Sequence, residues 1–184
     1  MTASPTQILK DEHRVIERVL AVLRRAAAKL EAGEKVDPSV FERGIDFIRN
    51  FADRYHHAKE ENALFTTMAA HGIPQQQGPI GVMLMEHEQG RAHVRGMAEA
   101  LEKYRAGDDA ARATLAEHAR GYADLLSAHI YKEDNILYPM GDRVMPAAVQ
   151  AGLLEDFRKL EERVLTPAER QRYMDTVAEL ETTV

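Results

Sequence analysis

The sequence predicts an all-α fold, an antiparallel up-down four-helix bundle with additional C-terminal helices. Apolar residues recur at intervals of three and four along most of the chain, which is the period of an amphipathic helix. Aromatic residues make up only 6% of the chain, whereas Ala, Glu, Leu and Arg, which favour helices, are abundant. Long helical segments joined by short connections that contain Gly or Pro are typical of an antiparallel bundle.

The first hairpin of the bundle is predicted from two helix starts. Ser4 caps a helix that runs from residue 5 to about residue 30, with proline at its first position. A second helix begins at Asp37-Pro38 and continues to about residue 70, where the sequence His-Gly-Ile-Pro at 71–74 breaks it. The short connection makes the two helices antiparallel neighbours.

The second hairpin follows the same plan. A third helix is predicted after the loop at residues 75–79, and it ends at about residue 106, where a glycine follows. Asp108 can cap the fourth helix, which we expect to end at Pro139 because proline cannot continue the hydrogen-bond ladder. Residues 1–140 are therefore expected to form the bundle.

Residues 141–184 are expected to be a helical extension packed on the same domain. One helix is predicted over residues 146–164 and another over residues 167–181. The second begins with a capping box, Thr166-Pro167-Ala168-Glu169. The extension contains no histidine, which favours a structural role.

One stretch occurs twice, as residues 56–65 and again as residues 129–138. The copies are identical at His56/His129, Lys59/Lys132, Glu60/Glu133, Asn62/Asn135 and Leu64/Leu137, with acid over acid at Glu61/Asp134. Each copy carries a His and a Glu four residues apart. On a helix this spacing places both side chains on one face, where they can reach one metal centre.

The repeat extends to the other two helices. His13 and His87 precede the two copies by nearly the same number of residues, and each follows a glutamate. The four helices together offer six donors: His13, His56, Glu60, His87, His129 and Glu133. The chain has no cysteine, so thiolate ligands are excluded. Imidazole and carboxylate suit iron or manganese and, less exclusively, zinc, and two opposed carboxylates favour a dinuclear centre.

Other residues compete for a place at this centre. His57 and Glu61 form a second pair at the same spacing, offset by one residue, but the alignment of the copies favours His56 and Glu60. His118 is expected in the core or beside the ligands, and Tyr55 and Tyr131 flank the two copies as candidate hydrogen-bond or redox groups.

These motifs resemble the hemerythrin-like (HHE cation-binding) domains over residues 6–140. The resemblance rests on Glu12-His13, His56-x-x-x-Glu60, Glu86-His87 and His129-x-x-x-Glu133 with Leu137-Tyr138-Pro139. It implies a four-helix bundle that holds two iron ions, with terminal His ligands and with two Glu bridging the irons beside an oxo or hydroxo group.

Two positions depart from the oxygen-carrying members of that family. They have a second His one turn after the third-helix ligand, where this chain has Arg91, which can line the entrance and attract anions. They also use a carboxylate at the position of Asp134, whereas the internal repeat favours Glu133. The missing imidazole leaves about two iron coordination positions open. We therefore expect a reactive centre rather than a reversible oxygen carrier.

The functional prediction is a protein that binds and reacts with a small oxidant, namely peroxide, dioxygen or nitric oxide, with peroxide detoxification as the more concrete activity. Family members linked to nitrosative stress carry a cysteine-containing N-terminal segment, and without a cysteine we do not expect iron-sulfur repair. The alternatives are a non-catalytic iron, oxygen or redox sensor or store, and a bundle that is empty or holds zinc. The net charge of −6 argues against nucleic acid or membrane partners, and a cytoplasmic location is expected.

Overall fold

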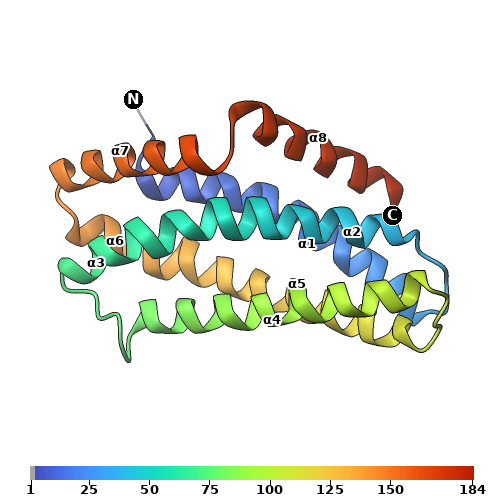
Figure 1. Cartoon of the computed structure of the whole chain (residues 1–184). Helices are drawn as coiled ribbons and strands as arrows, with labels where there is room; N and C mark the ends of the chain where they lie inside the picture. The colour runs from blue at the N-terminus through green and yellow to red at the C-terminus, as the bar shows by residue number, and fades with distance from the viewer. Residues whose placement is uncertain (1–2) are drawn as a thin grey trace.

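The computed structural model describes residues 3–184, and all regular secondary structure in that range is helical (Figure 1). Eight α-helices and three π-helical segments follow one another along the chain. They are α1 (Pro5–Glu31), α2 (Pro38–Phe47), η1 (Ile48–His57), η2 (Glu60–Leu64), α3 (Phe65–Ala70), α4 (Pro79–Arg105), α5 (Ala111–Lys132), η3 (Glu133–Leu137), α6 (Tyr138–Val144), α7 (Ala147–Val164) and α8 (Pro167–Thr183). The predicted all-α bundle is confirmed.

Side-chain caps fix several helix starts. The Ser4 hydroxyl accepts a hydrogen bond from the Gln7 N–H, so the predicted first cap is present. Both hydrogen bonds of the capping box predicted at Thr166 and Glu169 are also present. Asp108 lies farther from its helix than predicted, because its carboxylate accepts from the Ala110 N–H and α5 begins only at Ala111.

The predicted second helix is one helical rod from Pro38 to Ala70, but part of it is π-helix. In η1 and η2 the hydrogen bonds run from residue i to i+5, so each turn holds an extra residue. The extra residue rotates the side chains that follow away from the α-helical register. Apolar periodicity does not reveal such a change, and the sequence analysis missed it.

The predicted helix end at Pro139 is wrong, because the chain stays helical through α6 to Val144. Proline clashes with the carbonyl four residues earlier in a regular α-helix. Here the π-helical turn η3 directly precedes α6, and Pro139 lies in the first turn of α6. A proline at the start of a helix loses no hydrogen bond that the helix needs.

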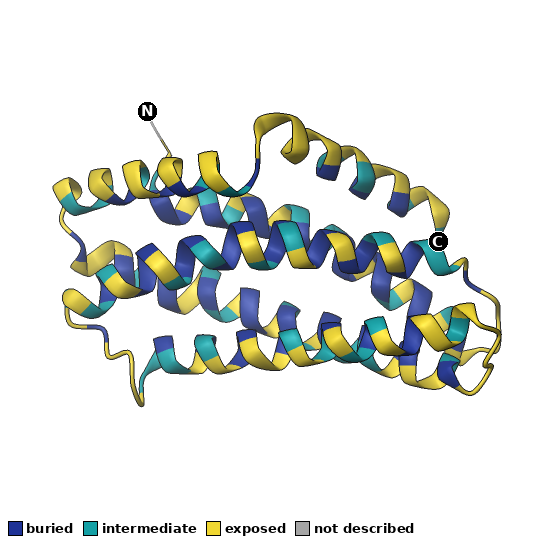
Figure 2. Ribbon diagram, in the orientation of Figure 1, coloured by how far each residue is buried: buried dark blue, intermediate teal, exposed yellow. Residues whose placement is uncertain are grey.

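Two apolar clusters fill the bundle. The larger one joins α1, α2, η1, α4 and α5 around residues such as Leu23, Phe47 and Leu115, and the smaller one joins α3, the start of α4 and α6 around Phe65 and Tyr138. Figure 2 shows the buried stripe along each long helix. A band of buried polar residues lies between the two clusters.

Helices α7 and α8 lie along one side of the bundle, where they contact α1, α2, η1 and η2 (Figure 1). Phe157 of α7 belongs to the smaller apolar cluster, and Tyr173 and Leu180 of α8 belong to the larger one. The division at residue 140 stays a prediction, and α6 spans it. Within residues 3–184 no helix has both the length and the apolar character needed to cross a bilayer.

Candidate metal centre

The middle of the bundle buries an unusual number of titratable side chains. Five imidazoles, four glutamates and one lysine are each at most 9% exposed: His13, His56, His57, His87, His129, Glu12, Glu60, Glu86, Glu133 and Lys59. Charged residues are rarely buried unless they are paired or bind a metal. The contacts of this band therefore define what it can bind.

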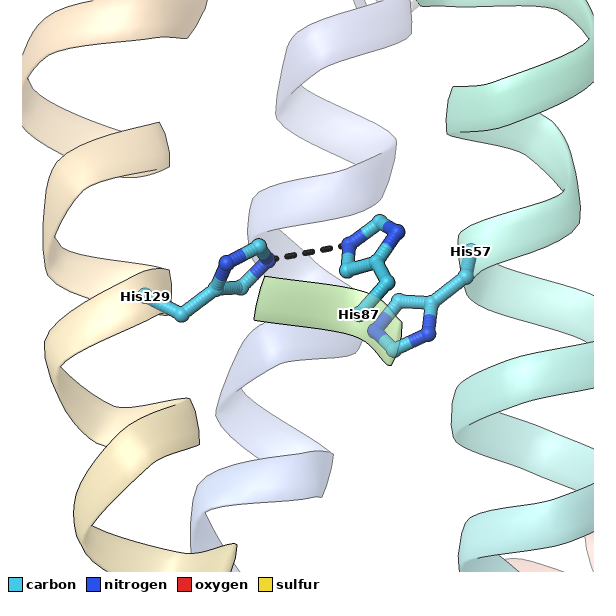
Figure 3. Close-up of side chains that lie close together, drawn as sticks. All are labelled: His57, His87 and His129. Carbon is cyan, nitrogen blue, oxygen red and sulfur yellow. Dashed lines mark hydrogen bonds between the residues drawn. The ribbon is translucent and has the colours of Figure 1, made fainter. Parts of the chain in front are cut away.

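The nitrogen and oxygen donors form two groups in which the ligand atoms lie within 4.8 Å of one another. The first group consists of His13, His56, Glu60 and Glu133. The second group consists of His57, His87 and His129, which come from η1, α4 and α5 (Figure 3). Each group has enough donors to hold one metal ion.

Glu60 and Glu133 belong to the first group and also face the second group. The Oε2 atom of Glu60 is 3.6 Å from Nε2 of His56 and 3.6 Å from Nε2 of His87. The Oε2 atom of Glu133 is 3.3 Å from Nε2 of His13 and 3.2 Å from Nε2 of His129. Each carboxylate thus faces one imidazole of each group, which is the placement required to bridge two ions.

Several of these buried oxygens have no hydrogen-bond partner. Among residues 3–184, Oε2 of Glu60 and both carboxylate oxygens of Glu133 are unpartnered although they are fully buried. An isolated buried carboxylate is costly, and such orphans call for an ion or ordered water. The donor set therefore fits a pair of metal ions.

Every imidazole of the two groups has a carboxylate at its Nδ1 atom. The pairs are His13 with Asp134 at 2.8 Å, His56 with Glu12 at 2.8 Å, His57 with Asp53 at 3.4 Å, His87 with Glu61 at 2.7 Å and His129 with Glu86 at 2.9 Å. A carboxylate at Nδ1 fixes the tautomer and leaves Nε2 free as a metal ligand. The same arrangement at five residues is typical of histidines that bind a metal ion.

Two imidazoles show the need for a cation directly. Nε2 of His87 lies 3.1 Å from Nε2 of His129 (Figure 3). Burial opposes protonation of His129, but the charges of Glu133 and Glu86 raise its pKa to about 9. A metal ion at these two Nε2 atoms would take the place of any bound proton, so metal binding should release protons.

The two central carboxylates differ in their protonation. Burial and the neighbouring charge of Glu133 raise the pKa of Glu60 well above its usual value. Burial also opposes ionisation of Glu133, but the imidazoles of His129 and His13 lower its pKa well below the usual value. The Tyr138 hydroxyl donates to Oε1 of Glu60 and lies 3.5 Å from Nε2 of His13.

The contacts repeat between the two hairpins, as the sequence repeat implies. Lys59 forms an ion pair with Glu12, which accepts from His56, and Lys132 forms an ion pair with Glu86, which accepts from His129. Glutamates 12 and 86 each precede a lone histidine in the sequence. That position was visible in the alignment, but its role was not assigned.

The acids that follow the central glutamates orient the histidine of the opposite hairpin. Glu61 accepts from His87, and Asp134 accepts from His13. Neither acid belongs to the two donor groups. Arg91 donates to Glu61 at 2.8 Å and to Asp53 at 2.7 Å, so it acts on two imidazoles through their carboxylates.

The structure brings together all six donors that the sequence proposed, and it adds His57. The preference for His56 over His57 assumed a regular α-helix, on which the two face in different directions. Both lie in the π-helical segment η1, and both are buried, at 1% and 5% exposure. The repeat gave no signal for His57, because its counterpart in the second copy is Ile130.

The remaining candidates lie at different distances from the centre. Tyr131 is 66% exposed and does not face it, which corrects its proposed role. His118 also lies elsewhere, because its ring contacts His93, with 3.3 Å between the Nδ1 atoms. Tyr55 is buried but bonds to Glu161 of α7. Tyr138, which the sequence analysis named only as part of the motif Leu137-Tyr138-Pro139, contacts the first donor group.

The bundle and its paired His and Glu groups define a helical metal-binding protein. The chain matches the Hemerythrin HHE cation binding domain over residues 4–141 and therefore belongs to that family. The uncharacterized protein Rv1995 of Mycobacterium tuberculosis (strain ATCC 25618 / H37Rv) is 27% identical over 182 residues, which cover 97% of this chain and 69% of the relative. Mb2018 of Mycobacterium bovis, also uncharacterized, matches equally. No solved structure gives a significant match.

Proposed function

We propose that the protein holds two iron ions and reacts with a small oxidant, namely peroxide, dioxygen or nitric oxide. The observation that carries this proposal is the set of five buried imidazoles, each with a carboxylate at Nδ1, around two carboxylates with unpartnered oxygens. Nitrogen and oxygen donors without sulfur suit iron or manganese. When bound, a pair of iron ions supplies the redox chemistry for such a reaction.

The residues would divide unequally between the two ions. His57, His87 and His129 offer three imidazoles on one side, and His13 and His56 offer two on the other, with Glu60 and Glu133 shared. His57 thus supplies an imidazole from a different helix in place of the one missing at Arg91. The two-imidazole side has more room for an exogenous ligand than the three-imidazole side.

The chain supports a reaction on the two-imidazole side through Tyr138. Its hydroxyl is fully buried and holds a proton between Glu60 and His13. A ligand on this side would have a hydrogen-bond donor beside it in a site from which the surrounding apolar cluster excludes water. These features favour peroxide as the reacting oxidant.

Metal analysis with an absorption spectrum tests the proposal. Two irons per chain with the near-ultraviolet bands of a bridged ferric pair are expected, and about one zinc or no metal would refute it. Steady peroxide consumption should disappear in His56→Ala and Glu133→Ala. The exposed Glu162 of α7 offers a control, because Glu162→Ala should keep both iron and activity.

A second candidate function, a redox or metal sensor, is favoured by the link from the centre to the C-terminal helices. Glu161 of α7 accepts hydrogen bonds from Lys59 and Tyr55, and Arg170 of α8 donates to Tyr55. Lys59 also pairs with Glu12, which orients His56. Hydrogen exchange in α7 and α8 that changes with iron oxidation, without peroxide turnover, would support the sensor over the enzyme.

A further inference from the structure

A cavity of about 200 Å³ opens beside the second donor group, between η1, α4 and α5. Its inner end is formed by His57 and His87, whose rings stack with their centroids 3.8 Å apart. The Nδ1 atoms of both rings are engaged by carboxylates. The cavity is therefore adjacent to the candidate metal centre. Asp53, Glu86 and Arg91 of its lining contact the imidazoles or their carboxylates, and the remaining lining residues have no contact with the donor groups that the structure describes.

The walls of the cavity are mainly apolar and leave space for a ring. They include Ile48, Val94 and Leu126, which are all buried. Gly90 has no side chain to fill this space. A Cβ atom at this position would lie no closer than 3.4 Å to the Tyr122 ring, which is an ordinary contact distance. An apolar cavity of about 150 Å³ accommodates benzene in other proteins. A molecule of one ring with a small substituent therefore fits.

Tyr122 adds its ring to the apolar wall. Its side chain is 2% exposed, and its hydroxyl is itself covered by protein atoms, so the ring rather than the hydroxyl faces the cavity. A polar group of a ligand must therefore find its partner elsewhere in the lining.

The mouth of the cavity is positively charged. Arg49 and Arg95 are exposed, and neither makes an ion pair or a side-chain hydrogen bond with any residue the structure describes. The two acids in the lining are already engaged, Asp53 by Arg91 and Glu86 by Lys132. The free guanidinium groups are therefore available to an anionic ligand at the outer end.

We propose that this cavity binds a small organic carboxylate with an apolar body, of about the size of benzoate. Its apolar part packs against Ile48, Val94 and Leu126, and the carboxylate is held by Arg49 and Arg95. This inference goes beyond the proposed function, because the site needs no metal ligand and no turnover.

Titration calorimetry with sodium benzoate on the full chain as purified, with its metal bound, tests the inference. Benzoate should bind about tenfold more tightly than benzamide, which has the same shape without the charge. The double variant Arg49→Gln/Arg95→Gln should weaken benzoate binding about tenfold, and Gly90→Leu should abolish it by filling the cavity. Arg163→Gln, on the exposed side of α7, is the matched control and should bind as the parent does.

Two results would overturn the inference. One is that benzoate does not bind, or that benzamide binds equally well, since the arginines would then not contribute to ligand binding. The other is benzoate binding that persists in Gly90→Leu and changes the iron absorption spectrum, which would place benzoate on the metal. A circular dichroism spectrum verifies that Gly90→Leu is folded, and the smaller Gly90→Ala, which fills less of the cavity and should weaken binding, serves if it is not. Iron content is measured separately, so failure here leaves the proposed function untouched.

Discussion

Lys59 and Lys132 occupy equivalent positions of the repeat, yet their replacement by methionine should have unequal effects. Lys59 is fully buried, and its ammonium group contacts Glu12 and, at 2.9 Å, Glu161, over the face of Tyr55. Lys132 contacts only Glu86, and its side chain is 34% exposed. The two lysines share the pairing with a glutamate that orients a histidine, and they differ in burial and in the additional contacts of Lys59.

The magnitudes follow from what each change leaves behind. Removing one partner of a buried ion pair costs roughly 3–5 kcal/mol, because the other charge stays buried. Burial raises the pKa of Glu12 to about 7 even beside Lys59, so Glu12 will take up a proton when Lys59 is absent. We therefore expect Lys59→Met to cost about 3 kcal/mol, at the low end of this range. Lys132→Met should cost about 1 kcal/mol or less, as for a partly exposed pair.

Thermal unfolding followed by circular dichroism measures the difference. For a chain of this length each kcal/mol lowers Tm by roughly 2–4 °C, so Lys59→Met should lower it by about 6–12 °C and Lys132→Met by less than about 4 °C. Both variants are compared with the parent at the same iron content, because bound metal also stabilises. Equal decreases in Tm would refute the reasoning, since burial would then not decide the cost.

Three further predictions concern the centre and its surroundings. Glu60→Ala should lose most of the iron. Glu61→Ala should weaken iron binding only about 10–100-fold, because it removes the orientation of His87 and no ligand. Competition with a chelator measures both variants, and a larger loss of iron in Glu61→Ala would mean that Glu61 is the ligand. In metal analysis, His57→Ala should contain fewer than two irons per chain. The control is His71→Ala, which should keep both irons because His71 is half-buried and lies outside both donor groups. Unchanged iron in His57→Ala would exclude His57 as a ligand. Burial and the neighbouring charge of His118 lower the pKa of His93 in the folded protein below its usual 6.5. The unfolded chain therefore takes up a proton at a higher pH than the folded chain does, so the fold loses stability as the pH falls from 6.5 through the folded pKa. Between pH 7 and 5 the Tm of His93→Gln should therefore fall less than that of the parent, and equal slopes would show that the pair has no such effect.

Apolar periodicity and capping signals were sufficient for the long helices, because α1, α4, α7 and α8 begin and end close to the predicted residues. These signals are local, as are the hydrogen bonds that fix helix ends. The π-helical segments were not predictable, since an extra residue in a turn is stabilised by tertiary contacts around the centre rather than by composition. The continuation through Pro139 has the same origin.

Some residues of the candidate site were also predictable from the sequence and others were not. Comparison of the two copies proposed Glu60 and Glu133, and the structure places both between the donor groups, because equivalent residues of a repeated hairpin occupy equivalent places. His57 was ranked below His56, and Tyr138 was given no role, because each occurs in one copy only, opposite Ile130 and Phe65. A repeat reveals what the halves share. Residues present in one half must be found from their contacts.

Those two unmatched residues, His57 and Tyr138, make the two sides of the centre different. A duplicated hairpin would by itself produce two equivalent metal positions related by the pseudo-symmetry of the bundle. His57 adds an imidazole on one side, and Tyr138 adds a phenol on the other. Two metal ions held here would have unequal sets of donors, three imidazoles on the side of His57 and two on the side of Tyr138. An exogenous ligand would therefore have more room at one defined end of the centre.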